Sequence, residues 1–146
     1  MDMINLAANE AGFSSPEWDQ AELDVVFLGP RAIRHINRSF LDHDDVTDVI
    51  TFDLRAHNPA TLPTGCLGEI LICPARALEN AVEYNQPPEW ELTLYIVHGL
   101  LHLGGWDDQA SEDVRAMRRA ESRVMAVLRD RFNPSECFAF AKPNAK

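Results

Sequence analysis

Residues 90–108 read WELTLYIVHGLLHLGGWDD, a segment that the other elements have to pack around. Apolar residues cover almost every side of a helix drawn from Trp90 to Leu103, which is typical of a helix buried at the centre of a domain. The pair Gly104-Gly105 ends this helix, because glycine is the usual residue just past a helix C-terminus. The sequence therefore predicts a buried central helix followed by a tight turn.

The other expected elements are shorter and mix strands with helices. Strands are expected over 22–28, 47–52 and 68–73, and helices over 30–41, from Pro74 to about 85, and from a capping Ser111 onward. The segment 22–52 suggests a parallel strand–helix–strand crossover, and the loop over 55–67 suggests an antiparallel return. We expect a single α+β domain over 1–146, with a small mixed sheet packed with helices and a loosely held tail from about 133.

The composition is that of an ordinary globular protein. The chain has 146 residues, 46% hydrophobic and 25% charged, which fits one folded domain and excludes a disordered or fibrous chain. No apolar run is long enough for a membrane span, and no secretory signal is visible. Cys66, Cys73 and Cys137 are too widely spaced for a CxxC metal site or a disulfide framework, so a reducing cytoplasm is expected.

The charge is strongly acidic overall but unevenly distributed. A formal net charge of −10 argues against a general positive field for nucleic acid, and we expect neither DNA nor a membrane as a partner. Two segments are rich in arginine and could hold a polyanion locally, unless they are simply solvated helix faces. These arginines are Arg31, Arg34 and Arg38, and Arg115, Arg118, Arg119, Arg123, Arg129 and Arg131.

A candidate metal site lies at the end of the central helix. His98 and His102 are four residues apart, so both imidazoles face one side of the helix and can offer two nitrogen ligands to one zinc ion. The glycine pair turns the chain back, so that Asp108 can supply a carboxylate oxygen as a third ligand. Three protein ligands leave a position for water, as in catalytic zinc sites. The alternative is that other groups satisfy both imidazoles, since an apolar helix is a costly place for unpartnered polar rings.

Several chemistries are open to such a site. The spacing overlays the zinc-protease pattern H-E-x-x-H-x-x-G-x-x-H, with Gly105 at its glycine and Asp108 at its last histidine. Gly99 stands where a protease has its general-base glutamate, which disfavours peptide hydrolysis. Activated water would still serve phosphodiester hydrolysis. Two histidines and one carboxylate can also bind Fe(II) for oxygen chemistry, but no second cofactor signal accompanies them.

The segment from His98 to Asp108 resembles the HGxLHLxGYDH signature of the YbeY family, endoribonucleases and ribosomal-RNA maturation factors of bacteria. The resemblance runs from about Leu23 to Leu128. Further matches follow the order of the family: Asn37, TDVITF at 47–52, LGEILI at 67–72, Glu91, Leu94, Met117 and Glu121.

The resemblance implies an α+β domain with zinc in a cleft, manganese, iron and nickel being the alternative metals. By position, the metal ligands are His98, His102 and Asp108. The implied activity is hydrolysis of single-stranded RNA in ribosomal RNA maturation and ribosome quality control, with ribosomal RNA and components of the small ribosomal subunit as partners. Two other functions stay open: a non-catalytic ribosome-assembly factor with a structural metal, and a zinc metalloprotease-like hydrolase.

The chain departs from the family pattern in several places. Asp108 replaces the family's usual third histidine, so the site is less positive and its water is expected to be less acidic. Leu41 stands at the family's functional arginine, and Arg38, one helical turn earlier, is the candidate substitute for substrate binding. Trp106 could stack a base or pack beneath the metal loop. The segment 1–21 is short for the family, which predicts that an edge strand is missing.

Overall fold

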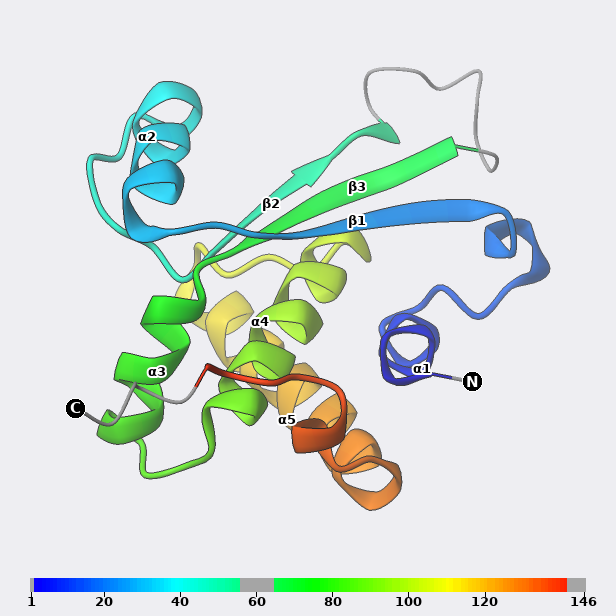
Figure 1. Cartoon of the computed structure of the whole chain (residues 1–146). Coiled ribbons are helices and arrows are strands. Elements are labelled where there is room, and N and C mark those ends of the chain that lie inside the picture. Colours follow the sequence, from blue (N-terminus) through cyan, green and yellow to red (C-terminus); the bar gives the residue numbers. More distant parts are fainter. Residues whose placement is uncertain (1, 56–64, 142–146) are drawn as a thin grey trace.

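A three-stranded sheet in the order β1-β3-β2 lies at the centre of the fold (Figure 1). The computed structural model describes residues 2–55 and 65–141, so most of the loop expected over 55–67 lies outside the described residues. The strands are β1 (Ala21–Phe27), β2 (Val49–Asp53) and β3 (Gly65–Ile72). Strand β3 runs parallel to β1 and antiparallel to β2, which gives a mixed sheet.

Helices cover both faces of this sheet. In Figure 1, α2 lies on one side of the strands, and α4 lies on the other side with α5 packed along it. Helix α4 contacts α1, α3 and α5 as well as β2 and β3, so it is the central helix that the sequence predicts. The helices are α1 (Met3–Glu10), α2 (Pro30–Leu41), α3 (Pro74–Glu83), α4 (Pro88–Leu103) and α5 (Ser111–Arg131), with 3-10 turns η1 (Pro16–Trp18) and η4 (Pro134–Glu136).

Strand β3 ends in three apolar residues, Ile70, Leu71 and Ile72, because both of its faces are covered there. Successive side chains of a strand point to opposite faces. Ile70 and Ile72 therefore join the main core with α4 and α5, whereas Leu71 and the following Cys73 join a second cluster with Ile33 of α2. A strand buried on both sides reads as a continuous apolar run rather than an alternating one.

The α+β class and the small mixed sheet are confirmed, but the expected parallel crossover over 22–52 is wrong. Strands β1 and β2 are not neighbours, and the parallel pair is β1 with β3. The most apolar strand takes the middle position, where both faces are buried, and this leaves β1 and β2 on its two sides. The expected antiparallel return from β2 to β3 is confirmed.

The two ends of the described chain carry further differences. Residues 2–20 form α1 and η1 and contain no strand. Helix α5 begins at Ser111, and its cap residue is Ala110 without a side-chain bond, so the expected Ser111 cap is wrong. Within residues 133–141, Pro134 is buried and Phe138 packs edge-on against Phe27 at 6.3 Å between ring centroids.

None of the helices in the described parts of the chain combines the length and the apolar character that crossing a bilayer requires.

Candidate metal centre and adjoining cleft

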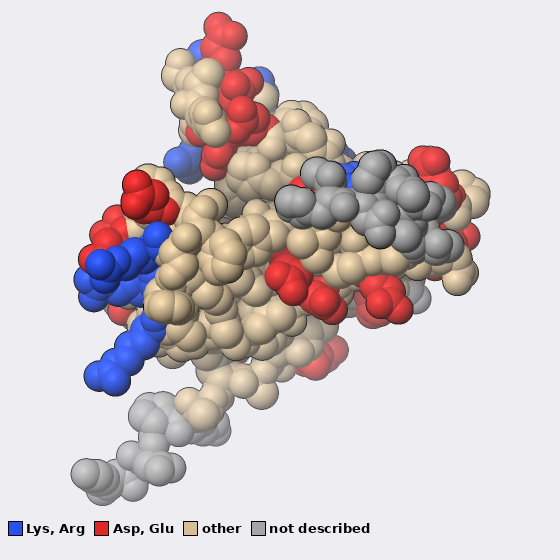
Figure 2. Space-filling model, turned by 90° about the horizontal axis from the view of Figure 1, so that it is seen from above, with Lys and Arg blue, Asp and Glu red and all other residues tan. Residues whose placement is uncertain are grey.

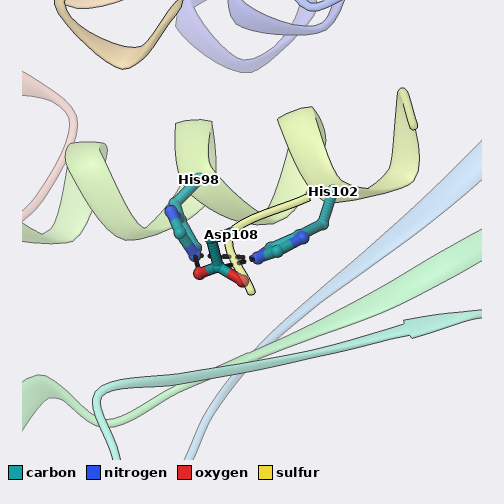
Figure 3. A group of neighbouring side chains, drawn as sticks. All are labelled: His98, His102 and Asp108. Atoms are coloured by element: carbon teal, nitrogen blue, oxygen red, sulfur yellow. Dashed lines mark hydrogen bonds and ion pairs between the residues drawn. The ribbon is translucent and has the colours of Figure 1, made fainter. Parts of the chain in front are cut away.

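Three side chains meet at the C-terminal part of α4 (Figure 3). His98 and His102 project from one side of the helix, and Asp108 returns to them from the loop that follows. The two Nε2 atoms are 2.9 Å apart, and Asp108 Oδ2 lies 3.5 Å from Nε2 of His98 and 3.6 Å from Nε2 of His102. One ligand atom from each residue lies within 4.8 Å of the others. The structure therefore brings together the group that the spacing predicts.

The turn after α4 explains how Asp108 reaches the histidines. Gly105 has φ +96°, a left-handed conformation that other residues rarely adopt. A Cβ on Gly104 would lie 2.7 Å from the carbonyl oxygen of Ala11, so the preceding position also needs glycine. The carboxylate of Asp107 accepts a 2.8 Å hydrogen bond from the Asp108 backbone N–H. The Asp107 carboxylate therefore bonds the backbone of the loop, and the Asp108 carboxylate faces the imidazoles (Figure 3).

Hydrogen bonds at Nδ1 orient both imidazoles. Nδ1 of His98 lies 2.5 Å from Glu121 Oε1 on α5, and Nδ1 of His102 lies 3.0 Å from the carbonyl oxygen of Trp106. Both partners are acceptors, so both Nδ1 atoms carry the proton in the neutral rings. The two Nε2 atoms then face each other with their lone pairs, an arrangement that a proton or a cation between them would relieve.

The donor set fits a divalent cation. Two imidazole nitrogens and one carboxylate oxygen suit zinc, whose catalytic sites have three protein ligands of these kinds. Metal-binding histidines usually donate their second ring N–H to a carboxylate or a backbone carbonyl, and Glu121 and Trp106 provide these two acceptors here. The three candidate ligands, and the acceptors that bond their second ring nitrogens, are therefore those expected of a divalent metal site.

The electrostatic environment of His98 also favours positive charge. Burial lowers the pKa of His98, but the hydrogen bond and charge of Glu121 outweigh this effect, and Asp108 and Asp48 add to it. The pKa of His98 is therefore raised above its ordinary value. The same field would favour a bound cation at this place.

Sequence reasoning missed Glu121 as the partner of His98. The family resemblance includes Glu121 only as a match on the final helix, since no local pattern links two residues that lie 23 positions apart. A usable signal is the spacing Val114, Met117, Glu121, which places the carboxylate on the inner side of α5 next to buried Met117.

A cleft of about 560 Å³ opens beside the histidines. His98 and Asp108 line it, and deeper in, Glu91 is 2% exposed and accepts a hydrogen bond from Gln86. The hydroxyl oxygen of Tyr95 accepts a 2.7 Å hydrogen bond from Asn80, and burial raises the pKa of Tyr95 above its usual range. The other polar side chains along the cleft are those of Asp48, Tyr84, Arg118 and Glu121.

The residues that the sequence offers for substrate contact lie away from this cleft. Arg38 is exposed on α2, and Trp106 is 39% exposed and lines a separate hollow with Asp107. Leu41, where the family resemblance implies an arginine, lines a neighbouring hollow of about 420 Å³ that shares Asp48 with the main cleft. The structure thus assembles the predicted ligand group, and Trp106 contacts His102 of that group through its backbone carbonyl, whereas neither Arg38 nor Trp106 lines the main cleft.

Comparison with known proteins gives consistent matches. Residues 2–129 match the model of the family described as Endoribonuclease YbeY. An Endoribonuclease YbeY of Rhodopirellula baltica is 41% identical over 112 residues, which cover 75% of this chain but only 55% of that relative. An Endoribonuclease YbeY of Staphylococcus aureus strain Newman is 40% identical over 112 residues, which cover 73% of this chain and 72% of the relative.

A solved structure agrees with these matches. The solution structure of a Thermotoga maritima protein superposes with a TM-score of 0.51 at 27% identity, covering 97% of this chain and 85% of that one. The family match spans every element from α1 to near the end of α5, including the stretch that carries both histidines and the returning aspartate. This chain therefore belongs to the YbeY family.

Proposed function

We propose that this chain is a metal-dependent endoribonuclease that cleaves single-stranded RNA in the maturation of ribosomal RNA. The observation that carries the proposal is the convergence of His98, His102 and Asp108 beside a cleft, in a member of the YbeY family. Relatives from Rhodopirellula baltica and Staphylococcus aureus are both named Endoribonuclease YbeY.

The metal ligands in this proposal are Nε2 of His98, Nε2 of His102 and a carboxylate oxygen of Asp108. Zinc is the first candidate, with manganese, iron and nickel as alternatives. When bound, the ion would supply Lewis-acid activation of a phosphodiester and of water. Glu121 and the Trp106 carbonyl hold the ring protons on Nδ1, which keeps both Nε2 atoms turned toward the ion.

Ribosomal RNA and components of the small ribosomal subunit are the proposed partners, and the cytoplasm is the proposed compartment. The family membership supports the RNA substrate. Cys66, Cys73 and Cys137 are all free thiols, which agrees with a reducing compartment.

Two observations weigh against the other functions. A structural metal site is normally closed, whereas the Asp108 side chain is 40% exposed and the site adjoins a cleft. A zinc protease needs a glutamate at position 99, but a Cβ on Gly99 would lie 2.8 Å from Cδ1 of Ile70. A longer side chain there would push against the central strand instead of reaching a substrate.

The test compares the zinc-loaded natural chain with His102→Ala and with His35→Ala, a control on the exposed surface of α2. Cleavage of a labelled single-stranded RNA is followed on gels, zinc content by elemental analysis, and folding by circular dichroism. We expect His102→Ala to lose zinc and cleavage while staying folded, and His35→Ala to keep both. Equal cleavage by the natural chain and His102→Ala would refute the catalytic role.

A further inference from the structure

The cleft beside the histidines is lined mainly by acids. Asp48, Glu91, Asp108 and Glu121 all contribute carboxyl groups to its walls. Among the described residues that line it, Arg118 is the only lysine or arginine. An RNA strand brings one negative charge per phosphate, so its approach to these carboxylates is unfavourable unless a cation offsets them.

Arg118 reaches the cleft because of the way α5 is rotated. The cleft-lining residues of α5 are Val114, Met117, Arg118 and Glu121, which follow the spacing i, i+3, i+4, i+7 of one helix face. Glu121 on this face bonds His98, so the face is turned toward His98, His102 and Asp108, which we call the metal group. Arg118 lies one turn before Glu121 on the same face.

Arg118 is also uncommitted within the structure. In the described parts of the chain it makes no hydrogen bond or ion pair, although its side chain is exposed beside the cleft. Five other arginines each bond a carboxylate, a carbonyl or an amide: Arg34, Arg55, Arg76, Arg123 and Arg129. The guanidinium of Arg118 therefore keeps its donors for a ligand.

The negative charge of the chain makes the Arg118 guanidinium more important for attracting RNA. Figure 2 shows Lys and Arg side chains gathered at the left edge of that view beside acidic side chains, and most of the visible face carries neither charge. The chain as a whole has a formal net charge of −10. This net negative charge provides no broad basic field to attract RNA, so a phosphate near His98 and Asp108 depends on a specific contact.

We propose that Arg118 binds a phosphate of the RNA strand and holds it in the cleft beside His98 and Asp108. The planar guanidinium of arginine can donate two parallel hydrogen bonds to a phosphate, which a point-like ammonium cannot do. This inference rests on the endoribonuclease function proposed above and adds a substrate-binding residue to it. Arg118 positions the strand, while the metal ligands belong to α4 and its following loop.

The test uses the full zinc-loaded chain and a fluorescein-labelled single-stranded RNA, with binding followed by anisotropy at several salt concentrations. The variants are Arg118→Gln, Arg118→Lys and the matched control Arg119→Gln, one residue along α5 but not on the cleft-lining face. We expect Arg118→Gln to weaken binding about tenfold, the usual effect of one lost charge-assisted contact. The slope of log affinity against log salt should become shallower by about 0.7.

Arg118→Lys should fall between the natural chain and Arg118→Gln, and Arg119→Gln should change the affinity less than about threefold, because exposed charges at a distance are screened by salt. Equal losses for Arg118→Gln and Arg119→Gln, or no loss for Arg118→Gln, would overturn the proposed contact. A loss of zinc from Arg118→Gln would overturn it as well, since the effect would then act through the metal group.

Cleavage gels run on the same samples separate this inference from the proposed function. RNA binding without cleavage by the natural chain would refute the endoribonuclease, while the comparison of Arg118→Gln with Arg119→Gln would still decide the phosphate contact. Failure of the natural chain to bind RNA at all would refute the contact too.

Discussion

Glu121 Oε1 lies 2.5 Å from Nδ1 of His98, and this contact joins α5 to the helix that carries the metal group. The carboxylate fixes which ring nitrogen of His98 holds the proton, and it contributes negative charge behind a candidate ligand. The side chain of Glu121 is only 17% exposed, so its charge is partly shielded from solvent. Its position explains why an acid on the last helix matters for a site on another helix.

Replacing Glu121 should weaken metal binding without removing a ligand. We expect Glu121→Ala to lower zinc affinity about 10- to 100-fold, because the loss of a group that orients a ligating histidine typically has this effect. Glu121→Gln keeps an oxygen acceptor and should lose less. The measurement is competition for zinc with a chelator, and Glu112→Ala in the exposed first turn of α5 is the control. Unchanged affinity in Glu121→Ala would contradict the role assigned to it.

Replacing Asp108 with histidine, the residue that the family resemblance implies there, should change the pH dependence of cleavage. A neutral imidazole leaves the bound cation more positive than a carboxylate does, and water near a more positive ion loses its proton more easily. We therefore expect Asp108→His to keep zinc and to reach its half-maximal cleavage rate at a lower pH. Asp107→Asn is the control, because the Asp107 carboxylate contacts the backbone rather than the imidazoles. Superimposable pH–rate profiles for Asp108→His and the natural chain would contradict the expectation.

Filling the space at Gly99 should destabilise the fold. A Cβ there would lie 2.8 Å from Cδ1 of Ile70 in the central strand, which requires the strand or the helix to move. We expect Gly99→Ala to lower the free energy of unfolding by about 1–3 kcal/mol, the range for overpacked cores. Urea unfolding measures the change. Gly29→Ala, with nothing within 4 Å of the added Cβ, should cost less. A Gly99→Ala chain as stable as the natural one would show that β3 and α4 are not in close contact.

Arg55 ties the strand region to the end of α4. Its guanidinium donates to Asp53 and to the carbonyl oxygen of Leu103, and it lies 5.8 Å from the ring centroid of Phe13 and 5.7 Å from that of Trp18. We expect Arg55→Met to reduce the free energy of unfolding by about 1–3 kcal/mol, because a part-buried carbonyl loses a charged donor.

A surface pair provides the control for Arg55. Arg34 and Asp44 are joined by two hydrogen bonds, but each side chain is 54% exposed. Exposed pairs of this kind contribute little to stability, so Arg34→Met should leave the urea midpoint nearly unchanged. Similar losses of unfolding free energy in Arg55→Met and Arg34→Met would mean that the contacts of Arg55 with the end of α4 stabilise the fold no more than an exposed ion pair does.

The ligand group could be predicted from the sequence because its geometry is local. His98 and His102 lie four positions apart, which fixes their relation on any helix, and the glycine pair predicts the chain reversal that brings Asp108 back. The apolar run from Trp90 to Leu103 likewise identifies the helix that becomes α4.

The strand pairing and the packing of α5 depend on contacts between segments far apart in the sequence, which no local pattern predicts. The pairing of β1 with β3 depends on which strand is best buried, and the contact of Glu121 with His98 depends on how α5 packs along α4. The same rotation of α5 decides that Arg118, and not Arg119, lines the cleft. The sequence shows these arginines as a basic helix face but not which of them meets a substrate.

The strand order has a consequence for how the chain acquires its shape. Strands β1 and β2 are both made before β3, yet each finds its hydrogen-bonding neighbour only in β3. During synthesis they must stay unpaired until residues 65–72 emerge, and such delayed non-local pairing is slow and prone to aggregation. Translation pauses or truncations before residue 65 should therefore leave β1 and β2 with unpaired backbone hydrogen-bonding groups. During that interval the nascent chain would need protection from aggregation.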